Sequence, residues 1–176
     1  MILIDAIKEL GHKNFQCLIV GSDQGREKYR RELEKVINQH ELADVIHVID
    51  HCEDMPAAYM LSDIVISASI EPEAFGRVVA EAQSLGRLVI AANHGGSRET
   101  VVDGETGWLT PPGDAKALAS IINRVLVQTA KERQVFSEQA IQHIRNKYSK
   151  SKMCNKTLEV YNALLGPKFS KLSFPS

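Results

Sequence analysis

Two glutamates eight positions apart, Glu73 and Glu81, are the side chains best placed to do chemistry. Pro72 disfavours helix at the position before it, so a helix that opens at Phe75 and Gly76 leaves Glu73 just ahead of its first turn. The apolar stripe predicted to be buried on this helix is Val78, Ala82 and Leu85. Glu81 then lies beside the stripe, half-buried, and the free N–H groups of the first turn can receive a phosphate or sugar oxygen. The pattern favours an anionic, polyhydroxylated ligand.

The same residues also permit a purely structural interpretation. Arg77 and Glu81 are spaced i,i+4 for an ion pair, and Glu73 can act as a charge at the positive end of the helix dipole. Each of these contributions is worth only about a few tenths of a kcal/mol. The segment taken alone does not separate the two interpretations.

Two other clusters contain residue types that can bind a cofactor or a metal. Residues 21–25 space their glycines as G-x-x-x-G, which is neither the dinucleotide fingerprint nor a Walker A loop, so nicotinamide cofactors and ATP hydrolysis are disfavoured. Residues 51–54, His-Cys-Glu-Asp, could ligate a metal, but no second cluster at zinc spacing accompanies them. We therefore expect no metal and no covalent cofactor.

The elements that must position these residues alternate along the chain. The predicted strands are 15–20, 45–49, 64–67, 88–92 and 108–109, and the predicted helices are 2–10, 26–40, 55–61, 75–85, 98–102, 115–127 and 132–147. This alternation predicts an α/β fold, with one Rossmann-like parallel sheet covered by helices on both faces. Ligands of such sheets bind at the carboxyl ends of the strands, which selects the loops at 21–25, 50–54, 69–76 and 93–97.

Composition and charge narrow the function classes. The 176 residues carry a formal charge of -1 and are 44% hydrophobic, which is typical of a globular protein. Three cysteines at wide spacings indicate a reducing, cytoplasmic compartment. Residues 145–176 contain seven basic residues and one acidic residue, a charge that could touch anionic lipid at the inner face of a membrane or simply face solvent. No nucleic-acid-binding signature is present, so we expect no nucleic-acid partner.

A series of short motifs follows in order through the second half of the chain. They are Ser67-Ala68-Ser69, Glu73-Ala74-Phe75-Gly76 with Glu81-Ala82, Gly86 to Ile90, Gly95-Gly96-Ser97-Arg98-Glu99, Asp103 to Gly107 and Pro112-Gly113-Asp114. In this order they resemble the C-terminal, donor-binding domain of family 4 retaining glycosyltransferases of the GT-B fold, including that family's E-x7-E motif. The segments 51–56 and 72–83 look similar to alphaproteobacterial members that act in cell-envelope polysaccharide or lipopolysaccharide synthesis.

The resemblance implies a role for each matching residue. It assigns the hydroxyls of the transferred sugar to Glu73, as the catalytic glutamate, and the ribose of the nucleotide to Glu81. The backbone amides of Phe75 and Gly76 would meet the sugar or diphosphate. The nucleoside pocket would be lined by Gly21, Ser22, Asp23, Cys52, Glu53 and Met55. The implied substrate is a nucleoside-diphosphate sugar, with no other cofactor.

The resemblance covers only part of such an enzyme. It implies a donor-binding domain at residues 1–165 that lacks its first strand, followed by a flexible tail at 166–176. The family's two diphosphate-binding cations and its N-terminal acceptor-binding domain lie outside the sequence, and Ala74 stands where many members have glycine. We therefore expect a hexosyltransferase part that is inactive alone. A non-catalytic nucleotide-binding remnant and a flavodoxin-like interaction module are the alternatives.

Overall fold

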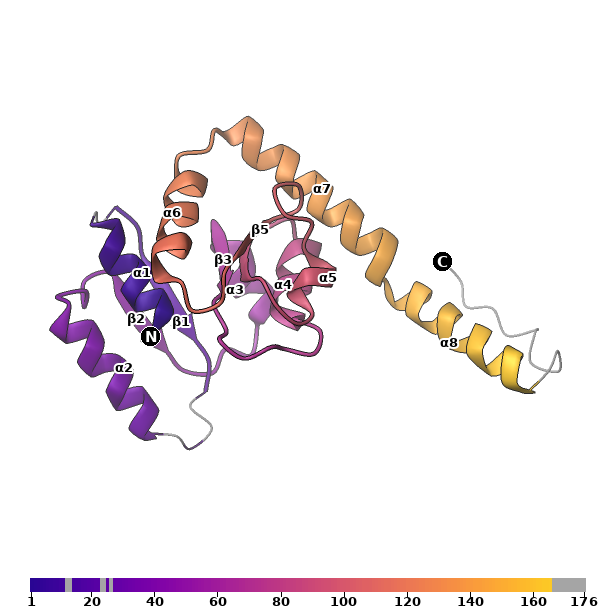
Figure 1. Cartoon of the computed structure of the whole chain (residues 1–176), viewed down its shortest axis with the longest axis horizontal. Coiled ribbons are helices and arrows are strands. Elements are labelled where there is room, and N and C mark those ends of the chain that lie inside the picture. The colour runs from indigo at the N-terminus through magenta and orange to yellow at the C-terminus, as the bar shows by residue number, and fades with distance from the viewer. Residues whose placement is uncertain (12–13, 23–24, 26, 166–176) are drawn as a thin grey trace.

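The computed structural model describes residues 1–11, 14–22, 25 and 27–165, and Figure 1 shows their arrangement. Helices and strands alternate through the first two thirds of the chain, as the sequence predicts. The elements are α1 (Ile2–Leu10), β1 (Cys17–Val20), α2 (Glu27–Gln39), β2 (Ile46–Ile49), α3 (Met55–Leu61), β3 (Ile64–Ser67), α4 (Arg77–Ser84), β4 (Leu88–Ala92), α5 (Ser97–Thr100), β5 (Trp108–Thr110), α6 (Ala115–Leu126), α7 (Ala130–Tyr148) and α8 (Lys150–Leu165). The α/β fold class is confirmed.

The strands are all parallel, but they form two hydrogen-bonded sheets instead of the single sheet predicted. β1 pairs with β2, with Leu18 opposite His47, and the second sheet has the order β3-β4-β5, with Ile66 opposite Ile90. Among the described strands, β1 and β3 are not paired with each other, so each has one unpaired edge. The predicted parallel, helix-flanked arrangement is present, divided into a two-stranded and a three-stranded sheet.

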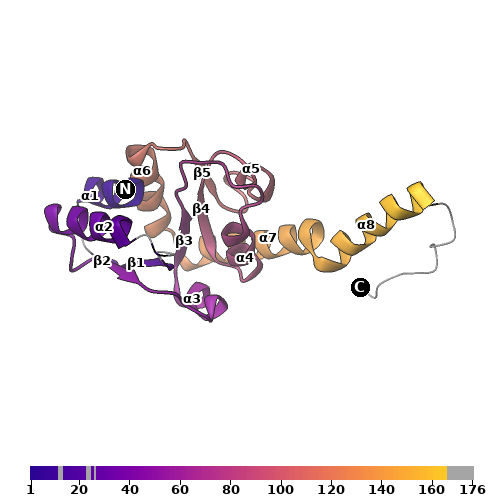
Figure 2. The ribbon, with the colours of Figure 1, turned by 90° about the horizontal axis from the view of Figure 1, so that it is seen from below.

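Helix α1 joins the two halves of the core. Ile4 and Ile7 pack with Leu33 and Ile37 of α2 in the cluster under β1 and β2, while Ala6 belongs to the cluster that β4, β5 and α6 form around Trp108. A helix whose successive residues face both clusters can hold the halves together without a hydrogen bond between β1 and β3. Figure 2 shows α1 beside both α2 and α6.

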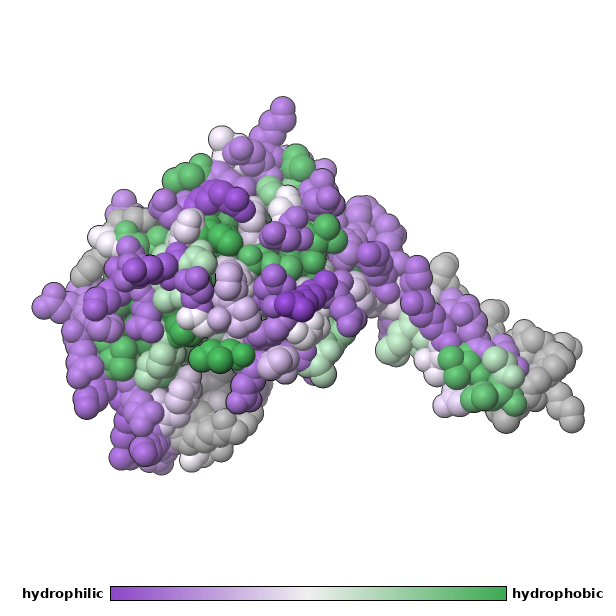
Figure 3. All heavy atoms as spheres, viewed as in Figure 1, coloured by the Kyte–Doolittle hydropathy of each residue, from purple (hydrophilic) through white to green (hydrophobic). Residues whose placement is uncertain are grey.

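The C-terminal helices differ in how they pack. α7 begins at a capping box, in which the Thr129 and Glu132 side chains bond each other's backbone N–H groups, and it lies along α4. α8 projects away from the body in both views (Figures 1 and 2). Its exposed apolar side chains are Met153, Val160, Tyr161 and Leu164, and part of this apolar side is visible in Figure 3. In the described part of the chain, no helix is long and apolar enough to span a membrane. The predicted flexible tail, 166–176, lies outside the described residues.

Candidate functional site

The loop at Ser69–Gly76 rests on the glycine pair that follows β4. The Gly96 N–H donates to the carbonyl oxygen of Glu73 at 2.8 Å. A Cβ atom added at Gly95 would lie 2.3 Å from that carbonyl oxygen, and one added at Gly96 would lie 2.3 Å from the carbonyl carbon of Phe75. Only glycine permits this approach, so two of the four predicted loops are packed backbone to backbone.

The Glu73 carboxylate is held from within the same loop. The Ser69 hydroxyl donates to Glu73 Oε1 at 2.8 Å. The carbonyl of Ser69 in turn accepts a hydrogen bond from His94 Nε2 at 2.8 Å, which places the ring proton on that nitrogen. Glu73 is half-buried, and one of its oxygens is oriented by a neighbour whose backbone is itself anchored.

Helix α4 begins two residues later than predicted and buries more residues than the predicted stripe. Gly76 is its N-cap, with φ at 73°, and has no side chain to cap the first turn. Val78 is exposed, so its predicted burial was wrong, whereas Ala82 is buried as predicted and Val79, Ala80 and Gln83 are buried as well. The physical reason is that α4 packs against the second sheet on one side and α7 on the other. Gln83 occupies the buried face because its amide donates to the Thr106 carbonyl at 2.9 Å.

Glu81 occupies the half-buried position that the sequence predicts. Its Oε2 accepts a hydrogen bond from the Tyr59 hydroxyl at 3.1 Å, and its Oε1 lies 2.9 Å from Arg77 Nη2. Burial, and then the Glu81 carboxylate, raises the pKa of Tyr59 to about 12, so the hydroxyl stays a donor. The Arg77–Glu81 ion pair of the structural interpretation is therefore present, together with the hydrogen bond from Tyr59 of α3.

The residues predicted to line a nucleoside pocket lie at the carboxyl ends of β1 and β2. Gly21 and Ser22 are exposed, and the Gly21 N–H donates to the Ile49 carbonyl at 3.2 Å. Glu53 is exposed and Cys52 is half-buried, while Met55 packs on the cluster around Tyr59 and Val79. Asp23 lies outside the described residues. Helix α3, which begins at Met55, joins the 51–55 segment to Glu81 through the Tyr59 hydroxyl.

Sequence analysis did not identify three residues that orient the two glutamates. Tyr59 was within a predicted helix, Ser69 within a motif and His94 within the predicted loop at 93–97, but none of them was assigned the contact that it makes. Tyr59 and Glu81 are 22 positions apart and His94 and Ser69 are 25 apart, so no local spacing reveals these contacts. Among the described residues, His, Cys, Asp and Glu form no group of three that could hold a metal ion.

Comparison with known proteins identifies the family. The family described as Glycosyl transferases group 1 matches residues 2–143, which is most of the chain. The chain belongs to this family. Its relatives include the lipopolysaccharide 1,2-N-acetylglucosaminetransferase of Salmonella typhimurium, 32% identical over 161 residues, a match that covers 85% of this chain and 41% of that enzyme. The chain spans less than half the length of the curated relatives it matches.

Solved glycosyltransferase structures share the fold of this chain. A glycosyltransferase from Rickettsia africae superimposes with a TM-score of 0.90 at 35% identity, covering 94% of this chain and 44% of that one. HepE from Anabaena, crystallised with UDP and glucose, superimposes with a TM-score of 0.86 at 29% identity, covering 92% and 44%. The Rossmann-like half of a GT-B glycosyltransferase is therefore the architecture of this chain.

The candidate site of this chain combines two kinds of polar group. Glu73 and Glu81 are carboxylates that can accept hydrogen bonds from hydroxyl groups. Between them, α4 presents the N–H groups of a first turn without a side-chain cap, which favour an oxyanion. Along the chain, the carboxylate acceptor of Glu73 is followed by the N–H donors of α4 and then by the carboxylate acceptor of Glu81. A ligand with hydroxyl groups on both sides of a phosphate would match this order.

Proposed function

We propose that the chain is the nucleotide-sugar donor-binding part of a retaining glycosyltransferase. The observation that carries the proposal is the pair of separately oriented carboxylates, Glu73 in the loop before the α4 N-terminus and Glu81 within α4. Glu73 binds the hydroxyls of the transferred sugar, Glu81 binds the ribose, and the amides of Phe75 and Gly76 meet the diphosphate. The HepE structures support this proposal, because that protein was crystallised with UDP and with UDP-glucose.

The proposed reaction uses no metal and no cofactor beyond the nucleotide sugar. Departure of the nucleoside diphosphate is assisted electrostatically by the helix start, and the sugar is held by Glu73 without a protein base acting on it. In this proposal the nucleoside pocket is lined by the described residues Gly21, Ser22, Cys52, Glu53 and Met55. The contact of Met55 with the cluster around Tyr59 supports a fixed position for this part of the pocket.

The acceptor is an envelope glycan or lipid in this proposal. The Salmonella relative is a lipopolysaccharide transferase, and a capsular polysaccharide glycosyltransferase of Staphylococcus aureus is 31% identical over 118 residues. A cytoplasmic site at the inner membrane face, reached through the basic segment 145–176, would fit such an acceptor. An N-terminal domain, outside this sequence, would hold it. Transfer by this chain alone is not expected, because the acceptor would not be positioned.

The proposal predicts different losses for the two glutamates. Glu81→Gln should weaken binding of UDP and of UDP-glucose by about tenfold or more, because a charged acceptor on the ribose is lost. Glu73→Gln should spare UDP and weaken only UDP-glucose. Calorimetric titration of both variants with both ligands measures this, and Glu9→Gln, an exposed glutamate on α1, is the control.

Two outcomes would contradict the assignment. Equal losses for both variants with both ligands would mean that the glutamates do not divide the donor between them. Sugar transfer by the 176-residue chain without an added N-terminal domain would contradict the half-site. If the roles hold and adding the N-terminal domain of the Rickettsia relative still gives no turnover, the chain is a non-catalytic nucleotide-binding module.

A further inference from the structure

The last residue of α7, Tyr148, contacts both the loop at Ser69–Gly76 and helix α5, which follows the glycine pair. Its ring packs edge-on against the ring of Phe75, with centroids 5.6 Å apart and an interplanar angle of 66°. Its hydroxyl donates to the backbone carbonyl of Glu99, in α5, at 2.5 Å. Phe75 is 73 positions away along the chain, so this contact exists only in the folded protein.

The Phe75 ring needs such a neighbour because its loop buries little else. Within the loop, Ile70 is 63% exposed and Phe75 is 41% exposed, and Glu71, Pro72 and Ala74 are also exposed. The backbone of the loop is supported by Gly96, and Tyr148 contacts its one aromatic side chain. Edge-to-face contact is a favoured geometry for two aromatic rings.

We propose that Tyr148 is a positioning residue for the donor loop, which it holds through the Phe75 ring. This contact holds the backbone of Phe75 and Gly76 in place. In the proposed function, the amides of these two residues meet the diphosphate. The proposal rests on that function for its effect on binding, but not for its effect on the loop itself.

The bond to Glu99 defines where the tyrosine ring stands. Burial, and then the neighbouring Glu99, raises the pKa of Tyr148, so its hydroxyl remains a hydrogen-bond donor at neutral pH. Because α5 follows the Gly95–Gly96 pair, the carbonyl that receives the bond belongs to the same support on which the loop rests. Tyr148 therefore connects the loop to its own support.

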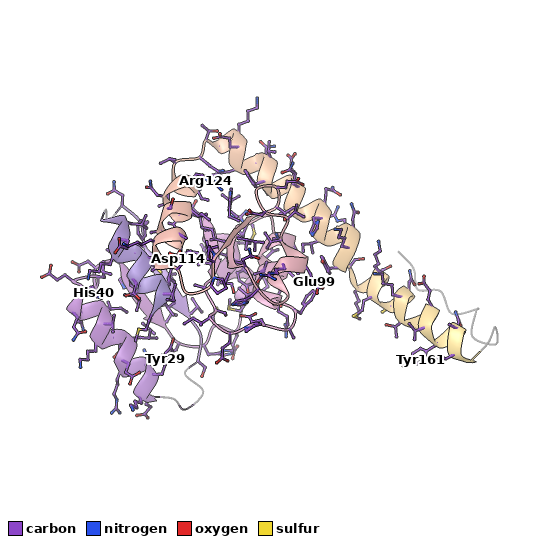
Figure 4. All side chains as sticks on the ribbon, viewed as in Figure 1. Tyr29, His40, Glu99, Asp114, Arg124 and Tyr161 are labelled. Atoms are coloured by element: carbon purple, nitrogen blue, oxygen red, sulfur yellow. The ribbon has the colours of Figure 1, made fainter. Side chains whose placement is uncertain are left out.

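Three variants separate the ring from the hydroxyl and from a general effect of losing a tyrosine. Tyr148→Leu removes both groups, Tyr148→Phe keeps the ring, and Tyr161→Leu removes an exposed tyrosine far out on α8, as Figure 4 shows. Amide exchange of residues 73–76 is measured in the absence of ligand, and UDP affinity is measured by calorimetry. Thermal melts report whether the fold as a whole is retained.

We expect Tyr148→Leu to speed exchange at 73–76 severalfold and to weaken UDP binding about two- to tenfold. Tyr148→Phe should restore most of both, and Tyr161→Leu should match the parent chain. If Tyr148→Leu does not fold, Phe75→Leu tests the same ring pair from the other side and should speed exchange equally. Parent-like exchange in whichever of these two leucine variants folds would overturn the proposal.

The outcomes keep this proposal distinct from the proposed function. If the parent chain binds no UDP but Tyr148→Leu still loosens residues 73–76, the donor site is wrong and the positioning contact stands. If UDP binds and the loop is unaffected by Tyr148→Leu, the contact is wrong and the donor site stands.

Discussion

At the scale of single residues, Glu73 and Glu81 differ in what surrounds them. Glu73 lies in a loop, and one of its carboxylate oxygens accepts a hydrogen bond from the Ser69 hydroxyl. In Glu81, one carboxylate oxygen accepts a hydrogen bond from Tyr59 and the other accepts from Arg77. A ligand hydroxyl would compete with a neutral partner at Glu73 and join a charged network at Glu81. The spacing of the two glutamates and the Arg77–Glu81 pair are visible in the sequence. The Tyr59 bond is not, because Tyr59 reaches Glu81 from a different helix, 22 positions away.

The glycine pair after β4 gives a prediction at this scale. In Gly96→Ala, the new Cβ would collide with the backbone of Phe75, so the loop must shift; we expect about 1 to 3 kcal/mol of lost stability and a loss of UDP binding. Gly113→Ala is the matched control, because its positive φ of 79° is strained by about 1 to 2 kcal/mol but nothing lies within 4 Å.

Denaturant unfolding and calorimetry measure the two effects separately. We expect both alanine variants to be destabilised and only Gly96→Ala to lose UDP. Retention of UDP binding by Gly96→Ala would show that the contact between the glycine pair and the loop does not position the site.

At the scale of elements, local sequence patterns predicted the bounds of several helices and strands. They did not predict which faces of a helix are buried by tertiary packing. The predicted and observed bounds agree for α3, where Asp54 accepts from the Ala57 N–H at the helix start, and for β3 and β4. For α4, the sequence favoured one apolar stripe because a helix on a sheet usually has one. A helix packed on two sides buries more of its circumference, so Val79, Ala80 and Gln83 are buried as well. The burial of a polar residue such as Gln83 cannot be predicted without knowing its hydrogen-bond partner.

The start of α7 gives a prediction about pH. The Glu132 carboxylate accepts from the Thr129 hydroxyl and backbone N–H at 2.7 and 2.8 Å, and these bonds lower the pKa of Glu132 below its ordinary 4.5. A carboxyl whose pKa is lower in the folded state stabilises the fold above its unfolded pKa, and that contribution is lost as pH falls through the folded pKa. Glu132→Gln should therefore melt lower than the parent chain at neutral pH.

The same comparison in acid completes the test. The difference in melting temperature between Glu132→Gln and the parent should shrink as the pH falls below 4.5 and the parent carboxyl becomes protonated. Thermal melts across the range measure this, with Glu138→Gln, an exposed glutamate of the same helix, as the control. If the difference in melting temperature stays constant with pH, the ionised Glu132 carboxylate is not the cause of the stabilisation.

At the scale of the whole molecule, the two sheets leave a place for one more strand. Doubly wound folds of the order 3-2-1-4-5-6 have a central strand, and β2-β1 and β3-β4-β5 are what remains when that strand is removed. The four residues of β3 are only half-buried and Leu18 of β1 is 57% exposed, whereas all five residues of β4 are buried. We propose that residues 1–165 form a domain that takes this strand from the polypeptide leading into α1.

A short extension of the chain tests this proposal. The N–H groups of Cys17 and Gly21 donate to the carbonyls of Val45, just before β2, and Ile49, at its end. The alternation of a strand therefore points the N–H groups of Leu18 and Val20 to the unpaired edge. Adding the strand and loop that precede the matched region in the Rickettsia relative, about 8 to 12 residues, should slow amide exchange at these two positions about tenfold or more. An extension carrying two prolines is the control, and unchanged exchange with the intact extension would contradict the proposal.

The central claim, that this chain carries a donor site, is tested most directly by titrating it with nucleoside diphosphates in a calorimeter. We predict saturable but weak binding of at least one of UDP, GDP and ADP. The carboxylates and helix start are present. The resemblance implies two diphosphate-binding cations outside this sequence, so we expect an affinity several hundredfold or more below that of an intact relative. No heat with any of the three at millimolar concentration would contradict the site at Glu73 and Glu81.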